Sequence, residues 1–141
     1  MTRDQILSLM RRRHVAWDEH DIATLVSLHA PNGVVVSPTG GVLEGRAEIE
    51  RIYRLWLTAF PDVKYRSDDL LIDGDRVVEV AQFSATHAGA FFGVPATGRR
   101  VEVQIAVIMT LADGLVAEER RIYDFTGFLV QVGVLKAKPV A

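Results

Sequence analysis

Hydrophobic residues repeat with two different periods along this chain, and the switch between them limits the fold class. Up to Phe60 they recur every three or four residues, which is typical of helices that bury one face. From Lys64 to Phe125 they alternate with polar residues, which is typical of strands. Helices followed by consecutive strands predict an α+β fold in which the helices pack against one curved sheet.

Turn residues divide these two regions into elements. We expect a helix over residues 2–19, a short helix after the N-cap Asp21, and a third helix that opens at residues 44–46 and ends at Pro61. The Asp-Gly sequences at residues 73–75 and 112–114 are hairpin signals. Together with the alternating and β-branched segments, these signals predict strands at residues 33–37, 64–72, 76–87, 99–111 and 115–125. A long glycine-containing loop is expected over residues 87–98, and a terminal helix after the last strand.

Size and composition restrict the classes of protein that need considering. A chain of 141 residues fits a single domain, residues 1–141, with a core large enough to be stable without disulfides. Its net charge of −2 gives no reason to expect nucleic acid or an acidic membrane as a partner. The absence of cysteine removes thiol nucleophiles and thiolate metal sites, and we expect no metal. Without an apolar run of about 18 residues or a signal-peptide core, a cytoplasmic protein is the default expectation.

Asp124 is the first candidate for a catalytic residue. It follows an alternating strand and precedes an apolar segment that is expected to be helical. A carboxyl group at the lip of a hydrophobic enclosure is suited to proton transfer, because apolar surroundings raise the pKa of an acid. The alternative is structural, since aspartate is also a favoured N-cap and Asp124 stands directly before this segment. Without any comparison to known proteins, the sequence around Asp124 favours the N-cap role over the catalytic role.

Further candidates stand beside the predicted strands and helices. His87 ends a strand before the glycine-containing loop, where it either polarises a substrate carbonyl or satisfies backbone groups of the loop. Four aromatic residues either line a pocket for a flat hydrophobic ligand or simply pack in the core: Trp17, Tyr53, Trp56 and Phe83. The strand residue Gln104 faces either solvent or the cavity. Arg120 shares the parity of Asp124 and would point into the same cavity, unless it is an exposed partner of the neighbouring glutamates.

Several segments resemble known proteins. Residues 13–31 are similar to the opening of nuclear-transport-factor-2-like domains. Within that superfamily, later segments resemble the SnoaL-like polyketide cyclase, or ester cyclase, family. The likeness covers nearly the whole chain and rests on Phe60-Pro61-Asp62, Thr86-His87-Ala88-Gly89, Gly93-Val94-Pro95-Ala96-Thr97-Gly98-Arg99 and the stretch from Asp113-Gly114 through Tyr123-Asp124 to Gln131-Val132-Gly133. Ala96 stands where the family more usually has a second proline.

The resemblance implies a cone-like, partly closed barrel of one strongly curved, mainly antiparallel sheet. Three to four helices would enclose a deep apolar pocket. It also implies ring closure by intramolecular aldol condensation on a carbonyl-rich hydrophobic substrate, without metal or organic cofactor. The family's acid/base aspartate corresponds to Asp124 and its histidine to His87. A homodimer or homotetramer formed through the outer face of the sheet is expected by the same likeness.

Two other functions remain open for a chain of this fold. One is a binding module that holds a hydrophobic small molecule without turnover. The other is an epoxide hydrolase or cofactor-free oxygenase on the same scaffold. Epoxide hydrolases of this fold use two aspartates bridged by an arginine, and no such set is evident in the sequence, although Arg120 would offer the arginine.

Overall fold

The computed structural model describes residues 1–137, so residues 138–141 of the predicted domain lie outside the described part. Its helices are α1 (Arg3–Asp18), α2 (Ile22–Ser27), α3 (Arg46–Ala59) and α4 (Phe125–Gln131). Its strands are β1 (His29–Ser37), β2 (Gly41–Glu44), β3 (Lys64–Asp73), β4 (Arg76–Thr86), β5 (Arg100–Ala112) and β6 (Leu115–Tyr123). The predicted helices before residue 60 and the predicted strands after it are both present, and β1 and β2 lie between α2 and α3.

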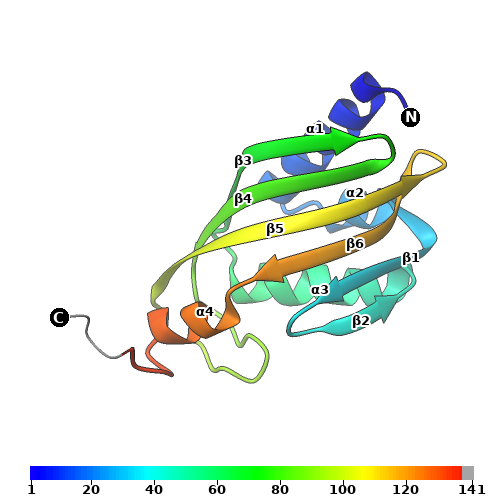
Figure 1. The fold of residues 1–141 in the computed structure, drawn as a ribbon. Coiled ribbons are helices and arrows are strands. Elements are labelled where there is room, and N and C mark those ends of the chain that lie inside the picture. The colour runs from blue at the N-terminus through cyan, green and yellow to red at the C-terminus, as the bar shows by residue number, and fades with distance from the viewer. Residues whose placement is uncertain (138–141) are drawn as a thin grey trace.

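The six strands form one curved sheet in the order β2-β1-β6-β5-β4-β3 (Figure 1). All neighbours are antiparallel except β1 and β6, which run parallel. The predicted α+β class with one strongly curved, mainly antiparallel sheet is confirmed. The sheet does not close, because β2 and β3 remain its two edges.

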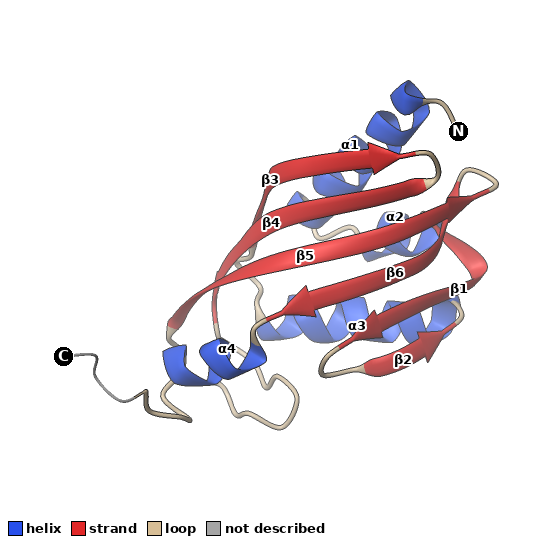
Figure 2. Cartoon of the chain, viewed as in Figure 1, coloured by secondary structure: helices blue, strands red, loops and turns tan. Residues whose placement is uncertain are grey.

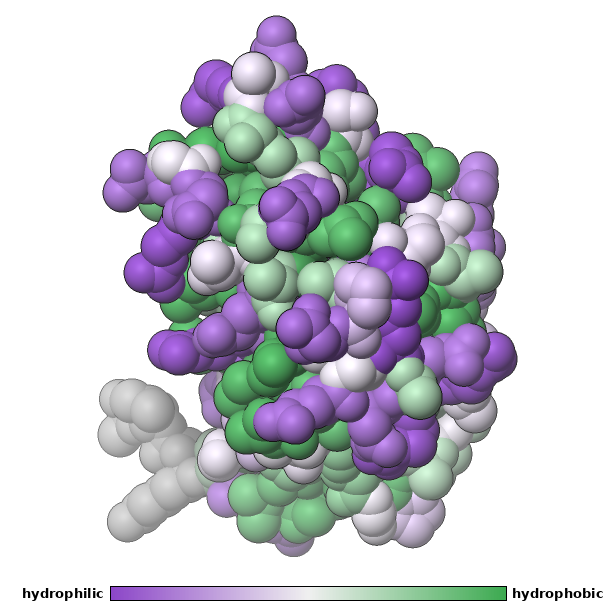
Figure 3. All heavy atoms as spheres, turned by 90° about the vertical axis from the view of Figure 1, so that its right-hand side faces the viewer, coloured by the Kyte–Doolittle hydropathy of each residue, from purple (hydrophilic) through white to green (hydrophobic). Residues whose placement is uncertain are grey.

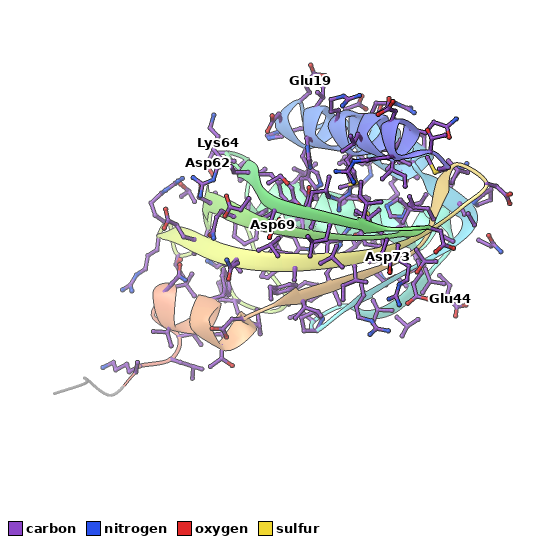
Figure 4. The ribbon with its side chains drawn as sticks, turned by 45° about the horizontal axis from the view of Figure 1, so that its top comes forward. Glu19, Glu44, Asp62, Lys64, Asp69 and Asp73 are labelled. Atoms are coloured by element: carbon purple, nitrogen blue, oxygen red, sulfur yellow. The ribbon has the colours of Figure 1, made fainter. Side chains whose placement is uncertain are left out.

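Three helices cover one face of the sheet, which we call the inner face, and α4 lies across one end (Figure 2). Helix α1 lies along the edge strand β3, on which Lys64, Asp69 and Asp73 mark the start, middle and end in Figure 4. Along β4, β5 and β6, successive side chains alternate between buried and more exposed positions. This alternation places every second residue of the three central strands in the enclosed core.

The first strand differs from its prediction. The strand expected at residues 33–37 begins at His29, because the segment Pro31-Asn32-Gly33 is a local irregularity within β1 and not a turn before it. His29 pairs with Val116 of β6, and the register shifts before the pairing resumes at Val34. The shift brings the His29 side chain into the interior, where it is 1% exposed.

Polar groups cover much of the molecular surface, as the side view in Figure 3 shows. On the outer face of the sheet, Leu71 and Ile122 are exceptions with exposed fractions of 59% and 50%. The expected homo-oligomer formed through this face remains a prediction. Among residues 1–137, no helix is both long enough and apolar enough to cross a membrane.

Candidate functional site

Four charged side chains are buried against the inner face of the sheet. Arg13 comes from α1, Glu79 from β4, and Glu119 and Arg121 from β6, and none is more than 5% exposed. Arg13 Nη2 donates to Glu119 Oε1 at 2.9 Å, and Arg121 Nε donates to Glu119 Oε2 at 2.5 Å. Arg13 Nη1 also lies 3.6 Å from Glu79 Oε1. A single guanidinium therefore bridges two buried carboxylates, and we call these four residues the charged cluster.

Both carboxylates of the charged cluster are held in the ionised form. Burial by itself raises the pKa of Glu119, but the positive charges of Arg121 and Arg13 outweigh it and hold this pKa far below its usual range. Burial also opposes ionisation of Glu79, yet hydrogen bonding by His14 and the charge of Arg13 lower its pKa overall. Within residues 1–137, no three His, Asp or Glu side chains are grouped as a metal ion would require.

A chain of hydrogen bonds leads from the interior to the surface through Glu79. Tyr65 of β3 donates its hydroxyl to Glu79 Oε1 at 2.5 Å, and His14 Nε2 lies 2.5 Å from Glu79 Oε2. The His14 side chain is 28% exposed, whereas that of Glu79 is fully buried. Burial raises the pKa of Tyr65 above its usual range, so this hydroxyl keeps its proton at neutral pH. The three groups connect a partly buried hydroxyl with solvent.

A small cavity lies between the charged cluster and the aromatic residues of α1 and α3, and we call it the donor cavity. It has room for about one water molecule, with a volume of about 10 Å³. Its wall joins cationic, aromatic and aliphatic side chains, namely Arg13, Trp17, Trp56, Tyr65, Phe83, Ile105, Val107 and Arg121. The predicted deep apolar pocket is therefore nearly filled by side chains in this conformation.

Three residues of this wall carry an N–H donor that has no hydrogen-bond partner in the described part of the chain. These donors are the indole Nε1 atoms of Trp17 and Trp56 and the Nη2 atom of Arg121, and all three are buried. Leaving a buried donor unpaired costs about 1–3 kcal/mol, so such groups are normally satisfied by a water or a ligand. The donor cavity thus offers hydrogen bonds that no described protein group takes up.

A second cavity of about 10 Å³ lies beside the first, toward α4. The two share Trp56 and Phe83 as wall residues. The remaining wall is apolar apart from one hydroxyl and consists of Phe60, Phe91, Val101, Val103, Tyr123 and Phe128. Phe91 belongs to the loop between β4 and β5, so that loop forms part of the cover of the second cavity.

The predicted aromatic residues lie together at this site. Trp17, Trp56 and Phe83 line the donor cavity. Tyr53 is fully buried beside it, with its ring edge-on to Trp17 and with the guanidinium carbon of Arg121 5.0 Å from its ring centroid. Contact of these four residues with a substrate stays a prediction.

Two of the predicted ligand-binding residues point elsewhere. Gln104 and Arg120 are exposed on the outer face, and Arg120 lies 3.8 Å from the equally exposed Glu118. The prediction that they line the interior cavity is wrong. The physical reason is strand parity: Glu119 and Arg121 occupy the inward positions of β6, so the residue between them must face outward.

Asp124 caps a helix. Its carboxylate Oδ1 accepts a hydrogen bond of 2.8 Å from the backbone N–H of Gly127, and its side chain is exposed. A Cβ at Gly127 would lie 2.4 Å from Asp124 Oδ2, so glycine leaves room for the capping carboxylate. Asp124 lines an outer hollow of about 270 Å³ together with Glu102, Gln104 and Gln131. The expected hydrophobic enclosure is not there, and the catalytic role of Asp124 stays a prediction.

The cap predicts a modest stability change. We expect Asp124→Ala to lower the free energy of unfolding by about 1 kcal/mol, because the Gly127 N–H loses its acceptor. Asp124→Asn should stay close to wild type, since asparagine is an equally good N-cap. Urea unfolding followed by circular dichroism measures both values, and equal losses in the two variants would contradict the capping role.

His87 lies under the loop between β4 and β5. It is fully buried between the rings of Phe60 and Phe128, and its Nδ1 atom is 3.0 Å from the hydroxyl of Thr97. Backbone bonds from His87 N–H to Arg99 and from Gly98 N–H to His87 close the base of the loop. Burial lowers the pKa of His87. The structure therefore does not bring His87 together with the exposed Asp124, and the catalytic role of His87 stays a prediction.

All four members of the charged cluster are absent from the sequence-based candidates, although the sequence carries a signal for two of them. The run of Arg11 to Arg13 is typical of a solvated helix face, yet Arg13 stands three residues after Met10 on the buried stripe of α1. Glu79 occupies an inward, otherwise apolar position of β4. Charged residues at positions of apolar periodicity are the pattern that would have revealed them.

Known proteins of the same fold match this chain over most of its length. The family model described as SnoaL-like polyketide cyclase matches residues 8–132. TsrD from Streptomyces laurentii is 30% identical, with 96% of this chain and 99% of TsrD covered and a TM-score of 0.85. AclR from Streptomyces galilaeus, a candidate hydroxylase, is 27% identical with coverages of 98% and 87% and a TM-score of 0.84. IdmH from Streptomyces antibioticus, a candidate polyketide cyclase, is 27% identical with coverages of 89% and 96% and a TM-score of 0.75. No curated protein matches the sequence.

Proposed function

Because the chain belongs to the SnoaL-like polyketide cyclase family, we propose that it is a cyclase-type enzyme that transfers protons on a carbonyl-containing, mostly hydrophobic substrate. The family match and the likeness to IdmH support the general reaction type. The observation that carries the proposal is the hydrogen-bonded path from the donor cavity through Tyr65 and Glu79 to His14. It links the donor cavity to solvent by side chains that can carry a proton.

The path suits the removal of a proton from carbon. As the substrate C–H proton moves to the Tyr65 oxygen, the Tyr65 hydroxyl proton moves to the ionised Glu79, and the C–H electron pair forms an enolate. The concerted transfer avoids a free tyrosinate, which the raised pKa of Tyr65 disfavours. His14 can exchange the proton on Glu79 with solvent, because its side chain is partly exposed.

Ring closure reverses the proton transfer. The enolate carbon attacks a second carbonyl of the same substrate, which forms the carbon–carbon bond and leaves an alkoxide on the second oxygen. Glu79 then returns its proton through Tyr65 to that alkoxide. No cofactor takes part in this cycle, and the enclosed site would hold the two reacting carbons in contact.

Asp124 is the competing acid/base within the same function. Its support is the resemblance of the segment around Asp124 to the family, and this residue lies within the matched residues 8–132. Its exposed position as a helix cap supports the path through Tyr65 instead. Asp124→Asn removes the charge and keeps the cap, so this substitution separates the two assignments.

The test measures exchange of the acidic C–H of a β-keto ester with solvent. Ethyl benzoylacetate in deuterium oxide is followed by proton NMR with the wild type, Tyr65→Phe and Asp124→Asn. We expect Tyr65→Phe to slow the catalysed exchange by about 10²-fold, because general acid–base catalysis contributes 10²–10⁴. Asp124→Asn should stay within about two-fold of wild type. The opposite pattern would transfer the acid/base role to Asp124, and no exchange by the wild type would favour a binding module.

Epoxide hydrolysis is a second candidate because of one observation. Glu79 and Glu119 are bridged by Arg13, which is the carboxylate–arginine–carboxylate arrangement expected of epoxide hydrolases of this fold, with glutamates in place of aspartates. The exposed Arg120 does not take this place. The lowered pKa of both carboxylates disfavours this function, because opening the epoxide requires an acid that protonates the ring oxygen. Formation of a diol from styrene oxide by the wild type would support it.

A further inference from the structure

We infer that Trp17, Trp56 and Arg121 form a site that donates hydrogen bonds to one carbonyl oxygen of a flat, mostly apolar ligand. We call it the acceptor site, because it binds a hydrogen-bond acceptor. The three residues line the same cavity, and each is at least 95% buried. Each carries an N–H group with no partner among the described residues. The inference rests on the proposed function, because it specifies which group of the substrate that cavity binds.

The wall of the donor cavity selects an acceptor over a donor. Both oxygens of Glu119 are already engaged, by Arg13 and Arg121, and both oxygens of Glu79 lie against Tyr65 and His14. The unpaired polar atoms in the wall are therefore donors, and a ligand amine or ammonium group would add to the unsatisfied groups. A ketone oxygen has two lone pairs and no hydrogen, so it fits this wall.

The charges around the donor cavity favour a neutral ligand oxygen that becomes negative during the reaction. The two arginines and two glutamates of the charged cluster cancel in charge, so the cavity has no net positive charge to balance a bound carboxylate. N–H donors strengthen their hydrogen bonds as a carbonyl oxygen turns into an enolate oxygen. Tyr65 lines the same cavity, which puts the proton path beside the oxygen that gains the charge.

The rest of the ligand has to be apolar and flat. Apart from the polar groups above, the donor cavity is bounded by Phe83, Ile105 and Val107, and the second cavity beyond Trp56 is lined mainly by aromatic rings. Each cavity holds about one water molecule. A larger ligand therefore enters only when side chains of these walls move, and Trp56 and Phe83 belong to the walls of both cavities.

A matched pair of ligands measures the contribution of the carbonyl oxygen to binding. β-Acetonaphthone carries a ketone, and β-isopropenylnaphthalene replaces its C=O by an isosteric C=CH₂. Isothermal titration calorimetry compares both ligands on the wild type, Trp17→Phe, Trp56→Phe and the double variant. Phenylalanine keeps an aromatic ring and removes the N–H. Phe83→Leu is the control, since it alters the same wall without removing a donor.

The wild type should bind the ketone at least about ten-fold more tightly than the alkene. Each tryptophan substitution should reduce this ratio by about three-fold, with the alkene reporting any change caused by shape alone. Phe83→Leu should weaken both ligands alike and leave the ratio unchanged. Equal affinity of the wild type for the two ligands, or a ratio that the double variant retains, would overturn the inference.

The binding ratio and the exchange reaction fail independently. If the ratio depends on the tryptophans while Tyr65→Phe exchanges as fast as wild type, the acceptor site stands and the proton path is wrong. If Tyr65→Phe abolishes exchange while the tryptophan variants keep the wild-type ratio, the proposed function stands and the acceptor site is wrong.

Discussion

Arg13→Met should lower the free energy of unfolding by about 3–5 kcal/mol. Arg13 neutralises two buried carboxylates, with Glu119 Oε1 at 2.9 Å and Glu79 Oε1 at 3.6 Å. Methionine leaves Glu119 with Arg121 as its one cation and leaves Glu79 with only the partly exposed His14 beside it. Removing one partner of a buried ion pair is costly because the charge left behind has lost both its water and its counter-charge.

The neighbouring arginine provides the control. Arg12 precedes Arg13 on α1 and is exposed, so Arg12→Met should change stability by no more than about 0.5 kcal/mol. Arg13→Lys should fall between the two, because an ammonium group cannot span both glutamates with the planar fork of a guanidinium. Guanidinium chloride unfolding measures all three variants. A loss below about 1 kcal/mol in Arg13→Met would mean that the two carboxylates are not held by this residue.

His29 should make the protein less stable in mild acid. Burial lowers the pKa of His29 from 6.5 to about 4, with Glu119 opposing this shift and Arg121, Arg13 and Arg46 adding to it. As the pH falls from 6.5 to 4, the unfolded chain binds a proton at His29 that the folded protein does not. The contribution of His29 to stability therefore falls across this window and levels off below it, where protonation of Glu79 and Glu119 continues to lower stability. A difference of about 2.5 pKa units corresponds to roughly 3 kcal/mol.

Substitution of His29 isolates this contribution. In the native state His29 Nε2 lies 2.8 Å from the Tyr53 hydroxyl, and glutamine retains a polar group for that contact. His29→Gln should therefore flatten the decline in stability between pH 6.5 and 4, as measured by urea unfolding at several pH values. His20→Asn is the control, because it removes a histidine that is exposed on the surface. A wild-type profile that is flat across this window would contradict the prediction.

The motif residues that carry the family likeness hold structural positions in this chain. Asp124 caps α4, and Thr97 lies against His87 in the loop that covers the second cavity. The side-chain amide of Gln131 bonds to both the backbone N–H and the backbone C=O of Glu102, which fastens α4 to β5. Local sequence motifs are most visible where a loop or cap needs particular residues close together in the chain. These motifs therefore identify the fold and do not by themselves locate the reacting groups.

The sequence by itself determines the fold class and the order of the elements. The change of hydrophobic period after Phe60, the caps and the Asp-Gly turns are local signals, and each acts through the backbone conformation of a few residues. It also determines which aromatic residues are buried, because Trp17 and Trp56 belong to the apolar stripes of their helices.

Only the tertiary structure brings the four residues of the charged cluster together. Arg13 and Glu119 are 106 positions apart, and their contact forms only when α1 packs on the strands that follow it. Parity along β6 cannot be assigned to a face until the other strands pair, which is why Arg120 was a candidate and Arg121 was not. Burial places four residues of types that usually lie on the surface in a set whose charges cancel. It also leaves N–H groups of Trp17, Trp56 and Arg121 without a partner among the described residues. That property depends on the exclusion of water, which no short segment of sequence determines.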